Sequence, residues 1–266
     1  MTHSLPTLSA ILITRNEAHN LHDCLQSMQG LVDQIIVVDS QSTDATLTIA
    51  QQFGAKVLQP TDWPGFGPQK NRALDLASCD WVFSIDADER VTPELATEIK
   101  HVLQTGQTNV AYKLPRLSSY CGKFIHHAGW QPDYVLRLFK RGTARFSDDL
   151  VHERVVTEHQ VVALRHHLLH YSYLNFSQVL SKVDAYSSAS AQQAYARGKR
   201  ATVASAVGHG AWAFFRTYVI RRGFLDGSHG LALAISNAET SYYKYLKLWH
   251  MQQANLATAK PPSMHG

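Results

Sequence analysis

Four short apolar segments, separated by helical repeats, occupy the first hundred residues. They are Leu8–Thr14, Gln34–Val38, Lys56–Leu58 and Trp81–Ile85. The first two are aliphatic, β-branched and uncharged, which is typical of buried strands, and the other two are predicted as a short third strand and a fourth strand. Between them apolar residues recur at helical spacing, as at Leu21, Cys24, Leu25 and Met28. The alternation predicts an α/β fold, with a mixed, mostly parallel sheet flanked by helices.

Residues that commonly bound helices support these boundaries. Asn16 precedes the first helical repeat and is expected to cap it. Gly54 stands where the helix that starts at Ser42 or Thr43 should end. Pro93 and Glu94 provide the proline and the acidic residue that favour the first turn of a further helix.

The pattern changes after about residue 110. Short β-like segments follow, at Val110–Leu114, Tyr134–Phe139, Arg154–Val156 and Val161–Leu164. A helix is expected to start at Asn175, with Gln178 as its capping partner, and helical repeats continue to the tail. We therefore predict an α/β domain over residues 1–170, with a first half at about 7–110 and a second at about 110–170. A helical C-terminal region follows over residues 171–266.

Composition narrows the class of protein. With 45% hydrophobic and 17% charged residues in 266, the chain can bury a core. Its net charge of +4 decides little by itself. The three cysteines are scattered, without a CxxC pair, so neither a disulfide framework nor a zinc site is expected. The N-terminus does not resemble a secretory signal, and we expect a reducing, cytoplasmic compartment.

Polar residues follow three of the predicted strands, at 14–17 (TRNE), 39–44 (DSQSTD) and 86–89 (DADE). In an open parallel sheet these strand ends share one edge, where ligands bind. Neither GxGxxG nor GxxxxGK[ST] is present, which argues against a dinucleotide site and a P-loop. Asp86 and Asp88 are two residues apart, so that one carboxylate can face a ribose and the other a divalent cation.

Taken together, residues 11–17 (ILITRNE), 37–45 (VVDSQSTDA) and 86–89 (DADE) resemble family 2 glycosyltransferases of the GT-A, Rossmann-like fold. Residues 129–141 (GWQPDYVLRLFKR), 151–153 (VHE) and 224–227 (FLDG) resemble bacterial lipopolysaccharide-core β-1,4-glucosyltransferases more narrowly. The resemblance covers roughly residues 7–250. Gln131 departs from it, since an aromatic residue is expected between Trp130 and Pro132.

The resemblance assigns roles to individual residues. It implies a UDP-sugar site formed by Thr14, Asn16, Glu17, Asp39, Lys70, Arg72 and Asp86, with Asp86 near the ribose. It implies Mg²⁺ or Mn²⁺ at Asp88, approached by His152. There are alternative interpretations. Lys70 and Arg72 could lie on a solvated helix face, and His152 could be structural.

Inverting transfer needs one general base on the acceptor hydroxyl. The resemblance favours Glu153 for this role, and the alternatives are Asp149, Asp148 and, less favoured, Asp133. Trp130 is expected either to stack on a sugar or to pack in a core.

The implied reaction moves glucose from UDP-glucose to a heptose of the lipopolysaccharide inner core, with no nucleic acid as partner. Two alternatives stay open: another UDP-sugar with a different lipid-linked or capsular glycan acceptor, and a non-catalytic scaffold that binds a nucleotide sugar. Because its acceptor is lipid-anchored, the enzyme is expected on the inner face of the inner membrane as a peripheral protein.

The tail suits that location. His209 and Arg216 interrupt its most apolar stretch, so a spanning helix is not expected. Aromatic residues stand beside cations, which is typical of an interfacial helix. The cations are Arg216, Arg221, Arg222, Lys244 and Lys247. A helical pair that packs on the catalytic domain is the alternative.

Overall fold

The computed structural model describes residues 5–105, 109–148 and 153–259, with side chains up to residue 253. The chain divides into two compact units. The first comprises Met1–Leu117 and Pro132–Tyr171, and the second comprises Ser118–Gln131 and Ser172–Gly266. Residues 118–131, within the predicted α/β domain, thus group with the C-terminal helices.

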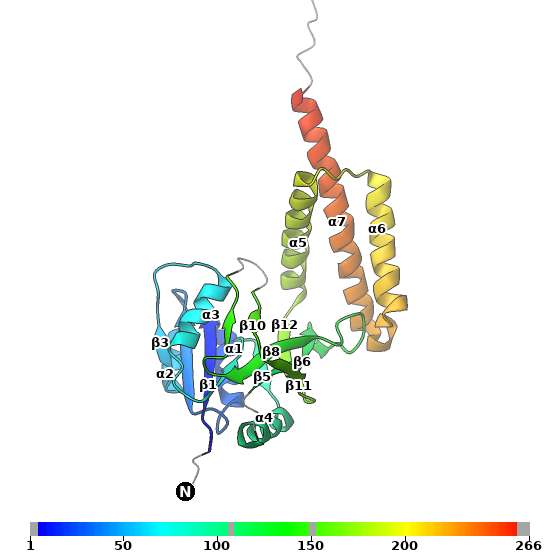
Figure 1. Ribbon diagram of the computed structural model, residues 1–266. Coiled ribbons are helices and arrows are strands. Elements are labelled where there is room, and N and C mark those ends of the chain that lie inside the picture. The colour runs from blue at the N-terminus through cyan, green and yellow to red at the C-terminus, as the bar shows by residue number, and fades with distance from the viewer. Residues whose placement is uncertain (1–4, 106–108, 149–152, 260–266) are drawn as a thin grey trace, which may run out of the picture. The chain divides into compact units, whose positions relative to one another are not determined.

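The first unit is built on a mixed sheet (Figure 1). Its principal strands follow the order β3-β2-β1-β4-β8-β6-β12-β5. Their bounds are β1 (Leu8–Thr14), β2 (Gln34–Asp39), β3 (Lys56–Leu58), β4 (Trp81–Ser84), β5 (Glu89–Val91), β6 (Val110–Tyr120), β8 (Tyr134–Lys140) and β12 (Leu168–Tyr173). Strands β1 to β4 pair in parallel, β8 runs antiparallel to β4 and β6, and β11 (Gln160–Ala163) pairs in parallel with β6. A separate hairpin joins β9 (Ala144–Phe146) and β10 (Val155–Thr157).

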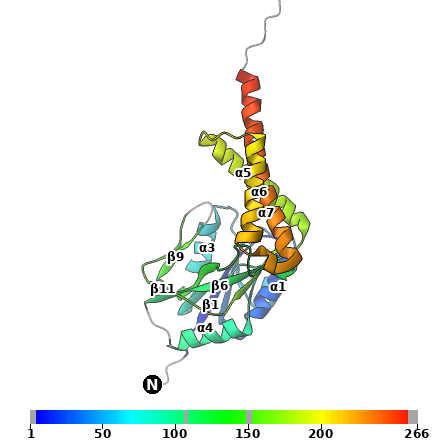
Figure 2. The same cartoon turned by 90° about the vertical axis from the view of Figure 1, so that its right-hand side faces the viewer.

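Strand alternation divides the core of this unit into two layers. Leu8, Ala10 and Leu12 point toward α1 (Ala18–Ser27) and α4 (Pro93–Thr105), with α2 (Thr46–Gln52) beside them. Ile11 points to the other face, against α3 (Phe66–Asp75). Figure 2 shows α3 and α4 on different sides of the strands. Both faces are therefore covered, which confirms the predicted α/β architecture.

One predicted cap is wrong. Asn16 does not cap α1, because the N-cap residue is Glu17, whose side chain makes no capping hydrogen bond. Asp44 Oδ2 instead accepts from the backbone N–H of Ala18, the first residue of the helix, at 3.1 Å. Asn16 instead has a positive φ of 56°, a conformation that asparagine tolerates, and turns toward the neighbouring loop. The prediction at Asn175 is confirmed, since its side chain accepts a hydrogen bond from the backbone N–H of Gln178.

The second unit contains three long helices that lie side by side (Figure 1). They are α5 (Phe176–Ala196), α6 (Val203–Phe215) and α7 (Gly227–Ala259), joined with short turns at Arg216–Ile220 and Gly223–Asp226. The small strand β7 (Lys123–Phe124) pairs with the end of β6. Buried Asp226 accepts hydrogen bonds from the backbone N–H groups of His126 (3.1 Å) and His127 (2.9 Å), and so fixes this segment to the turn before α7.

Lys247 has a structural role within this unit. Its ammonium group lies 2.6 Å from Asp184 Oδ1 and also bonds to Ser187 and Ser188, so that it joins α7 to α5. It is therefore engaged between helices and is not free for the lipid headgroups that the sequence suggested. Within the described chain, no helix has both the length and the apolar character needed to cross a membrane.

Candidate active site

The parallel pairing of β1 and β2 sets Thr14 beside Asp39 at one sheet edge. The Thr14 hydroxyl donates to Asp39 Oδ2 at 2.8 Å, and the backbone N–H of Ser42 donates to Asp39 Oδ1 at 2.8 Å. Asp39 is fully buried. Its carboxylate therefore organises the loop after β2, next to the edge where the sequence predicts the nucleotide.

Asn16 and Glu17 connect the two loops at this edge. Asn16 Oδ1 accepts from the backbone N–H of Thr43 at 2.8 Å, and the backbone N–H of Glu17 donates to Thr46 Oγ1 at 2.8 Å. The Glu17 carboxylate accepts from Asn20 at 2.9 Å. Burial is the main cause that raises the pKa of Glu17, and Asp88 adds to it. Glu17 therefore presents to the cavity a carboxyl group whose charged form is disfavoured by burial.

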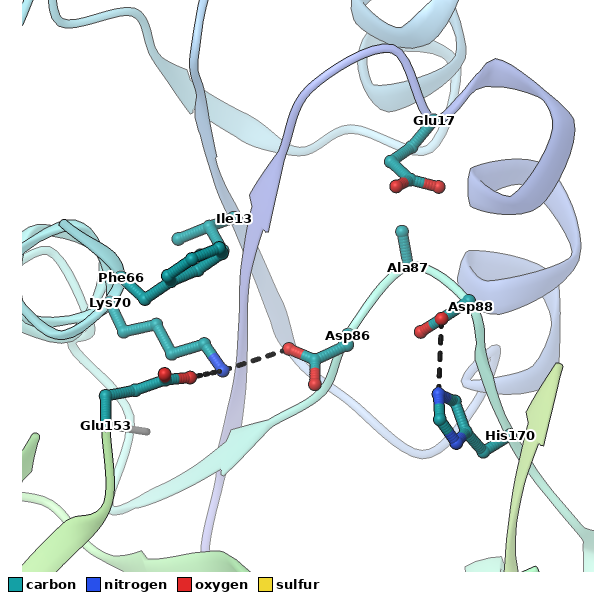
Figure 3. A pocket seen from close by; sticks show the side chains of 9 residues that line it. All are labelled: Ile13, Glu17, Phe66, Lys70, Asp86, Ala87, Asp88, Glu153 and His170. Carbon is teal, nitrogen blue, oxygen red and sulfur yellow. Dashed lines mark hydrogen bonds and ion pairs between the residues drawn. The ribbon is translucent and has the colours of Figure 1, made fainter. Parts of the chain in front are cut away.

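A cavity of about 360 Å³ lies at the carboxyl ends of β1 and β4. Four of the predicted site residues line it: Glu17, Lys70, Asp86 and Asp88, together with the proposed base, Glu153. Figure 3 shows the two aspartates pointing apart, Asp86 toward Lys70 and Asp88 toward His170. The DxD segment thus presents its carboxylates to two different parts of one cavity.

Asp86 is held by two cations. Its Oδ1 lies 3.1 Å from Lys70 Nζ, and its Oδ2 pairs with the guanidinium of Arg137. Partial burial raises the pKa of Asp86, but Arg137 and Lys70 outweigh it, so that the pKa lies far below its ordinary value. Arg137 also bonds to Glu89 Oε1 at 2.7 Å. Full burial raises the pKa of Glu89, against the effect of Arg137.

Lys70 connects Asp86 to Glu153, 83 residues away in sequence. Its ammonium lies 2.9 Å from Glu153 Oε1, and the lysine side chain is only 8% exposed. Two features of α3 make this approach possible. Asn71 bonds to both backbone polar groups of Phe146 (2.9 and 3.0 Å), and a Cβ at Gly67 would lie 1.9 Å from Ser147 O. Glycine at position 67 therefore lets the segment that carries Glu153 lie against α3.

Asp88 and His170 form a second pair in the cavity. Asp88 Oδ2 lies 3.2 Å from His170 Nε2. Among the described residues no group of three or more histidine, cysteine, aspartate or glutamate side chains could hold a metal. Mg²⁺ is usually held by one or two carboxylates together with substrate phosphates, so the Asp88 carboxylate, which faces an open cavity, fits such a cation as one of its ligands.

Other predicted residues lie elsewhere. The guanidinium of Arg72 pairs with Asp62 (2.9 and 2.7 Å) and does not line the cavity. Asp133 accepts from Arg116 Nε at 2.9 Å, and Asp148 is exposed outside the cavity. Trp130 packs on Tyr120 and Tyr173 in the second unit, as a core tryptophan would. Asp149 and His152 fall outside the described residues.

Three residues of the site are absent from the sequence prediction: Glu89, Arg137 and His170. Arg137 could have been identified from the sequence, because a charged residue between Leu136 and Leu138 in a largely apolar strand is unusual. Glu89 belongs to the DADE segment, but neither its position nor the resemblance assigns it a role. His170 is one of several histidines in its region, and nothing local distinguishes it.

The glycosyl transferase family 2 model matches residues 9–161. An uncharacterized glycosyltransferase of Rickettsia felis is 31% identical over 258 residues, which cover 91% of this chain and 89% of the relative. The lipopolysaccharide core biosynthesis glycosyltransferase LpsC of Rhizobium meliloti is 30% identical over 272 residues, covering 98% and 97%. A solved structure, glucosyl-3-phosphoglycerate synthase from Mycobacterium tuberculosis, is 29% identical, covers 43% of this chain and 44% of that chain, and has a TM-score of 0.36.

Proposed function

The chain belongs to glycosyl transferase family 2, and we propose that it transfers glucose from UDP-glucose to a heptose of the lipopolysaccharide inner core, with inversion. The fold is of the GT-A type, as predicted. The observation that carries the proposal is the single cavity in which Glu17, Asp86, Asp88, Lys70 and Glu153 converge. The acceptor class is supported by the similarity to LpsC over nearly the whole chain.

On this proposal the donor nucleotide lies at the ends of β1 and β2. Glu17 accepts from a base N–H or a ribose hydroxyl, and the Thr14–Asp39 pair supports the loop beneath it. Asp88, positioned by its contact with His170, would hold Mg²⁺ or Mn²⁺. When bound, such a cation neutralises charge that develops on the departing diphosphate. Lys70 supplies a further positive charge on the same side of the cavity.

Glu153 is the proposed base. Its carboxylate takes the proton of the acceptor hydroxyl while that oxygen bonds to the anomeric carbon. The bond from this carbon to the diphosphate oxygen breaks on the opposite face, and UDP leaves. Lys70 holds Glu153 in place through an ion pair of 2.9 Å. Asp149 is the alternative base and lies outside the described residues.

The test is release of UDP from UDP-glucose with Mn²⁺ and a purified core acceptor. Asp88→Ala should abolish release, whereas Asp75→Ala, an exposed aspartate on α3 that pairs with Arg145, should leave it unchanged. Glu153→Gln should retain UDP-glucose binding and lower transfer by roughly 10²–10⁴. If Glu153→Gln turns over normally while Asp149→Asn does not, the base is Asp149. If the wild type releases UDP no faster than Asp88→Ala, the enzymatic proposal is refuted.

The same assay separates the alternatives. Transfer from a different UDP-sugar, or to a different lipid-linked or capsular glycan, would keep the chemistry and change the substrates. Tight UDP-glucose binding without transfer to any acceptor would identify a non-catalytic scaffold.

We further propose that the second unit binds the inner face of the inner membrane as a peripheral anchor. Around the turn after α6, large apolar side chains are exposed: Trp212 (53%), Phe215, Ile220, Phe224 and Leu225. Arg216, Arg221 and Arg222 are exposed in the same segment. Apolar rings beside cations suit the interface of a bilayer that contains acidic lipids.

A flotation assay with anionic and neutral vesicles tests the anchor. Trp212→Ser combined with Arg222→Ser should weaken binding to anionic vesicles. Val156→Ser, which changes an exposed apolar residue of the first unit, serves as control. Unchanged binding by the double variant would refute this location of the anchor.

A further inference from the structure

A second cavity of about 350 Å³ lies in the first unit, lined by residues of β8, β9 and β10. Lys70, Asp86 and Glu153 line both this cavity and the one described above. The ion pairs of Lys70 therefore stand where the two cavities meet. A group in the second cavity has access to the same Glu153 carboxylate as a group in the first.

The charges that line the second cavity are unequal. Lys70, Arg116, Arg137 and Arg154 contribute four cations, against the two carboxylates of Asp86 and Glu153. Both carboxylates already have cationic partners in Lys70 and Arg137. Arg116 reaches out of the cavity to Asp133 at 2.9 Å and lies 3.5 Å from Glu89. Arg154 is exposed, and its guanidinium has no hydrogen bond or ion pair with the part of the chain that the structure describes.

A buried donor gives a second, independent indication. The side chain of Arg137 is 7% exposed, and its Nε has no hydrogen-bond acceptor among the described residues. Buried polar atoms are rarely left unpaired. Glu89 and Asp133, which do not line the cavity, pair with Arg137 and Arg116. Two N–H groups of the lining still have no acceptor among the described residues, the Arg137 Nε and the Arg154 guanidinium, and they favour an anionic ligand.

The remaining lining is suited to a sugar. Tyr134 is 45% exposed at the cavity, with Phe146 and the aliphatic Val135 and Val155 beside it. Ligand cavities of this size combine apolar and aromatic walls with a few polar groups that fix orientation. The exposed ring of Tyr134 can pack against the C–H face of a sugar ring, while the arginines bind its charged substituent.

We propose that the second cavity is the acceptor subsite and selects a sugar that carries an anionic substituent, a phosphate or a carboxylate, through Arg154 together with Arg116. This inference rests on the proposed glycosyl transfer, because it assigns the acceptor to the side of Glu153 opposite the donor. Arg154 binds the anion, and Tyr134 positions the ring so that a hydroxyl meets the Glu153 carboxylate. Neutral glycans of the same size bind more weakly.

The test measures binding and transfer separately on the full-length protein. Three synthetic heptose disaccharides serve as probes: one phosphorylated, one in which a sugar acid replaces the second heptose, and one neutral. Saturation-transfer NMR gives their affinities, and transfer assays give the acceptor KM with UDP-glucose and Mn²⁺. The wild type should bind at least one anionic probe about tenfold more tightly than the neutral one, the contribution of one charge-assisted hydrogen bond.

Arg154→Ala should remove that preference and raise the acceptor KM about tenfold, while affinity for UDP-glucose stays unchanged. Arg154→Lys should restore part of the preference, since it returns the charge. Arg145→Ala is the matched control, because Arg145 is exposed on the neighbouring strand, pairs with Asp75 and lies outside the cavity. The phosphate and carboxylate probes show which anion is preferred.

Equal binding of all three probes by the wild type would overturn the inference, whether or not transfer occurs. A preference that survives in both Arg154→Ala and Arg154→Glu would overturn it as well. If binding is selective and depends on Arg154 but no sugar is transferred, the anion subsite stands and the proposed function fails. The two failures are therefore distinguishable.

Discussion

Lys70 is the most informative single position to perturb, because its ammonium group is shared between two carboxylates. It lies 3.1 Å from Asp86 Oδ1 and 2.9 Å from Glu153 Oε1. At about 3 Å and an effective dielectric of 20, each attraction amounts to roughly 5 kcal/mol before desolvation is counted. Removing one partner of a buried ion pair typically costs about 3–5 kcal/mol. Arg137 remains on Asp86, and the two carboxylates are 33% and 18% exposed, so we expect about 3 kcal/mol.

Lys70→Met should lower the free energy of unfolding by that amount at pH 7, as measured by urea denaturation with tryptophan fluorescence. Hydrogen exchange of peptides from β4 and β8 would place the loss in the first unit. The double variant Lys70→Met/Glu153→Gln should recover more than 1 kcal/mol, because no unpaired Glu153 carboxylate then remains. Lys56→Met, at an exposed position on β3, is the control.

The pH dependence provides a second check on this reasoning. The pKa of Asp86 is depressed in the folded state, so its charge contributes stability above the unfolded pKa of about 4, and this contribution is lost as the pH falls through the folded pKa. Without Lys70 the depression is smaller. The stability gap between wild type and Lys70→Met should therefore be constant from pH 6 to 8 and narrow below about pH 4. A loss no larger than that of Lys56→Met would refute the shared-charge account.

Three further predictions follow from other contacts. Glu17→Gln should raise Tm slightly at pH 7 and not at pH 4, because the raised pKa of Glu17 in the folded state makes its charged form destabilising as the pH rises. The increase should be less than the 2–4 °C that 1 kcal/mol produces in a chain of this size. The affinity for UDP-glucose, measured by calorimetry, should fall, and an unchanged affinity would contradict the donor role of Glu17. Gly67→Ala should lower the free energy of unfolding by about 1–3 kcal/mol in urea denaturation and slow sugar transfer, because the new Cβ would lie 1.9 Å from Ser147 O. As a control, Gly208→Ala in α6, where the Cβ would meet open space, should leave the free energy of unfolding unchanged or raise it. Asp226→Ala should destabilise the second unit by about 2 kcal/mol, since two backbone N–H groups lose their acceptor. Residues 123–127 should then exchange their amide hydrogens faster. Exchange at the wild-type rate would argue against the hydrogen bonds of Asp226 with His126 and His127.

Sequence alone predicted the elements of the parallel half of the sheet closely. The bounds of β1 and β3 agree with the structure, and those of β2 and β4 differ by one residue. For β1 and β4 this accuracy has a physical cause, since a strand buried on both faces leaves a local signature of uncharged, apolar residues. β3 is an edge strand with Lys56 and Leu58 exposed, so this cause does not apply to it. Parallel topology also predicts the sheet edge at which Asp86 and Asp88 lie, although it does not predict the contacts of their side chains.

The contacts of the site could not be predicted in the same way. Lys70 meets Glu153 only because α3 docks on the β9–β10 hairpin, and Asp88 meets His170 only because β12 lies next to β5. Such contacts depend on long-range register, on which a local pattern carries no information. Asn16 is a further example, because its side chain bonds to the backbone of Thr43, 27 residues away in the sequence, and does not cap the helix that follows it.

The shared position of Lys70 has a thermodynamic consequence. One ammonium group cannot hold Asp86, Glu153 and an incoming diphosphate equally well, so occupancy of the first cavity alters the charge that the second cavity presents. Linkage requires the influence to be mutual: whatever factor the sugar nucleotide imposes on affinity for the acceptor, the acceptor imposes on affinity for the sugar nucleotide. Binding of the sugar nucleotide is thus expected to change the affinity for the acceptor through the Lys70 side chain that both cavities share.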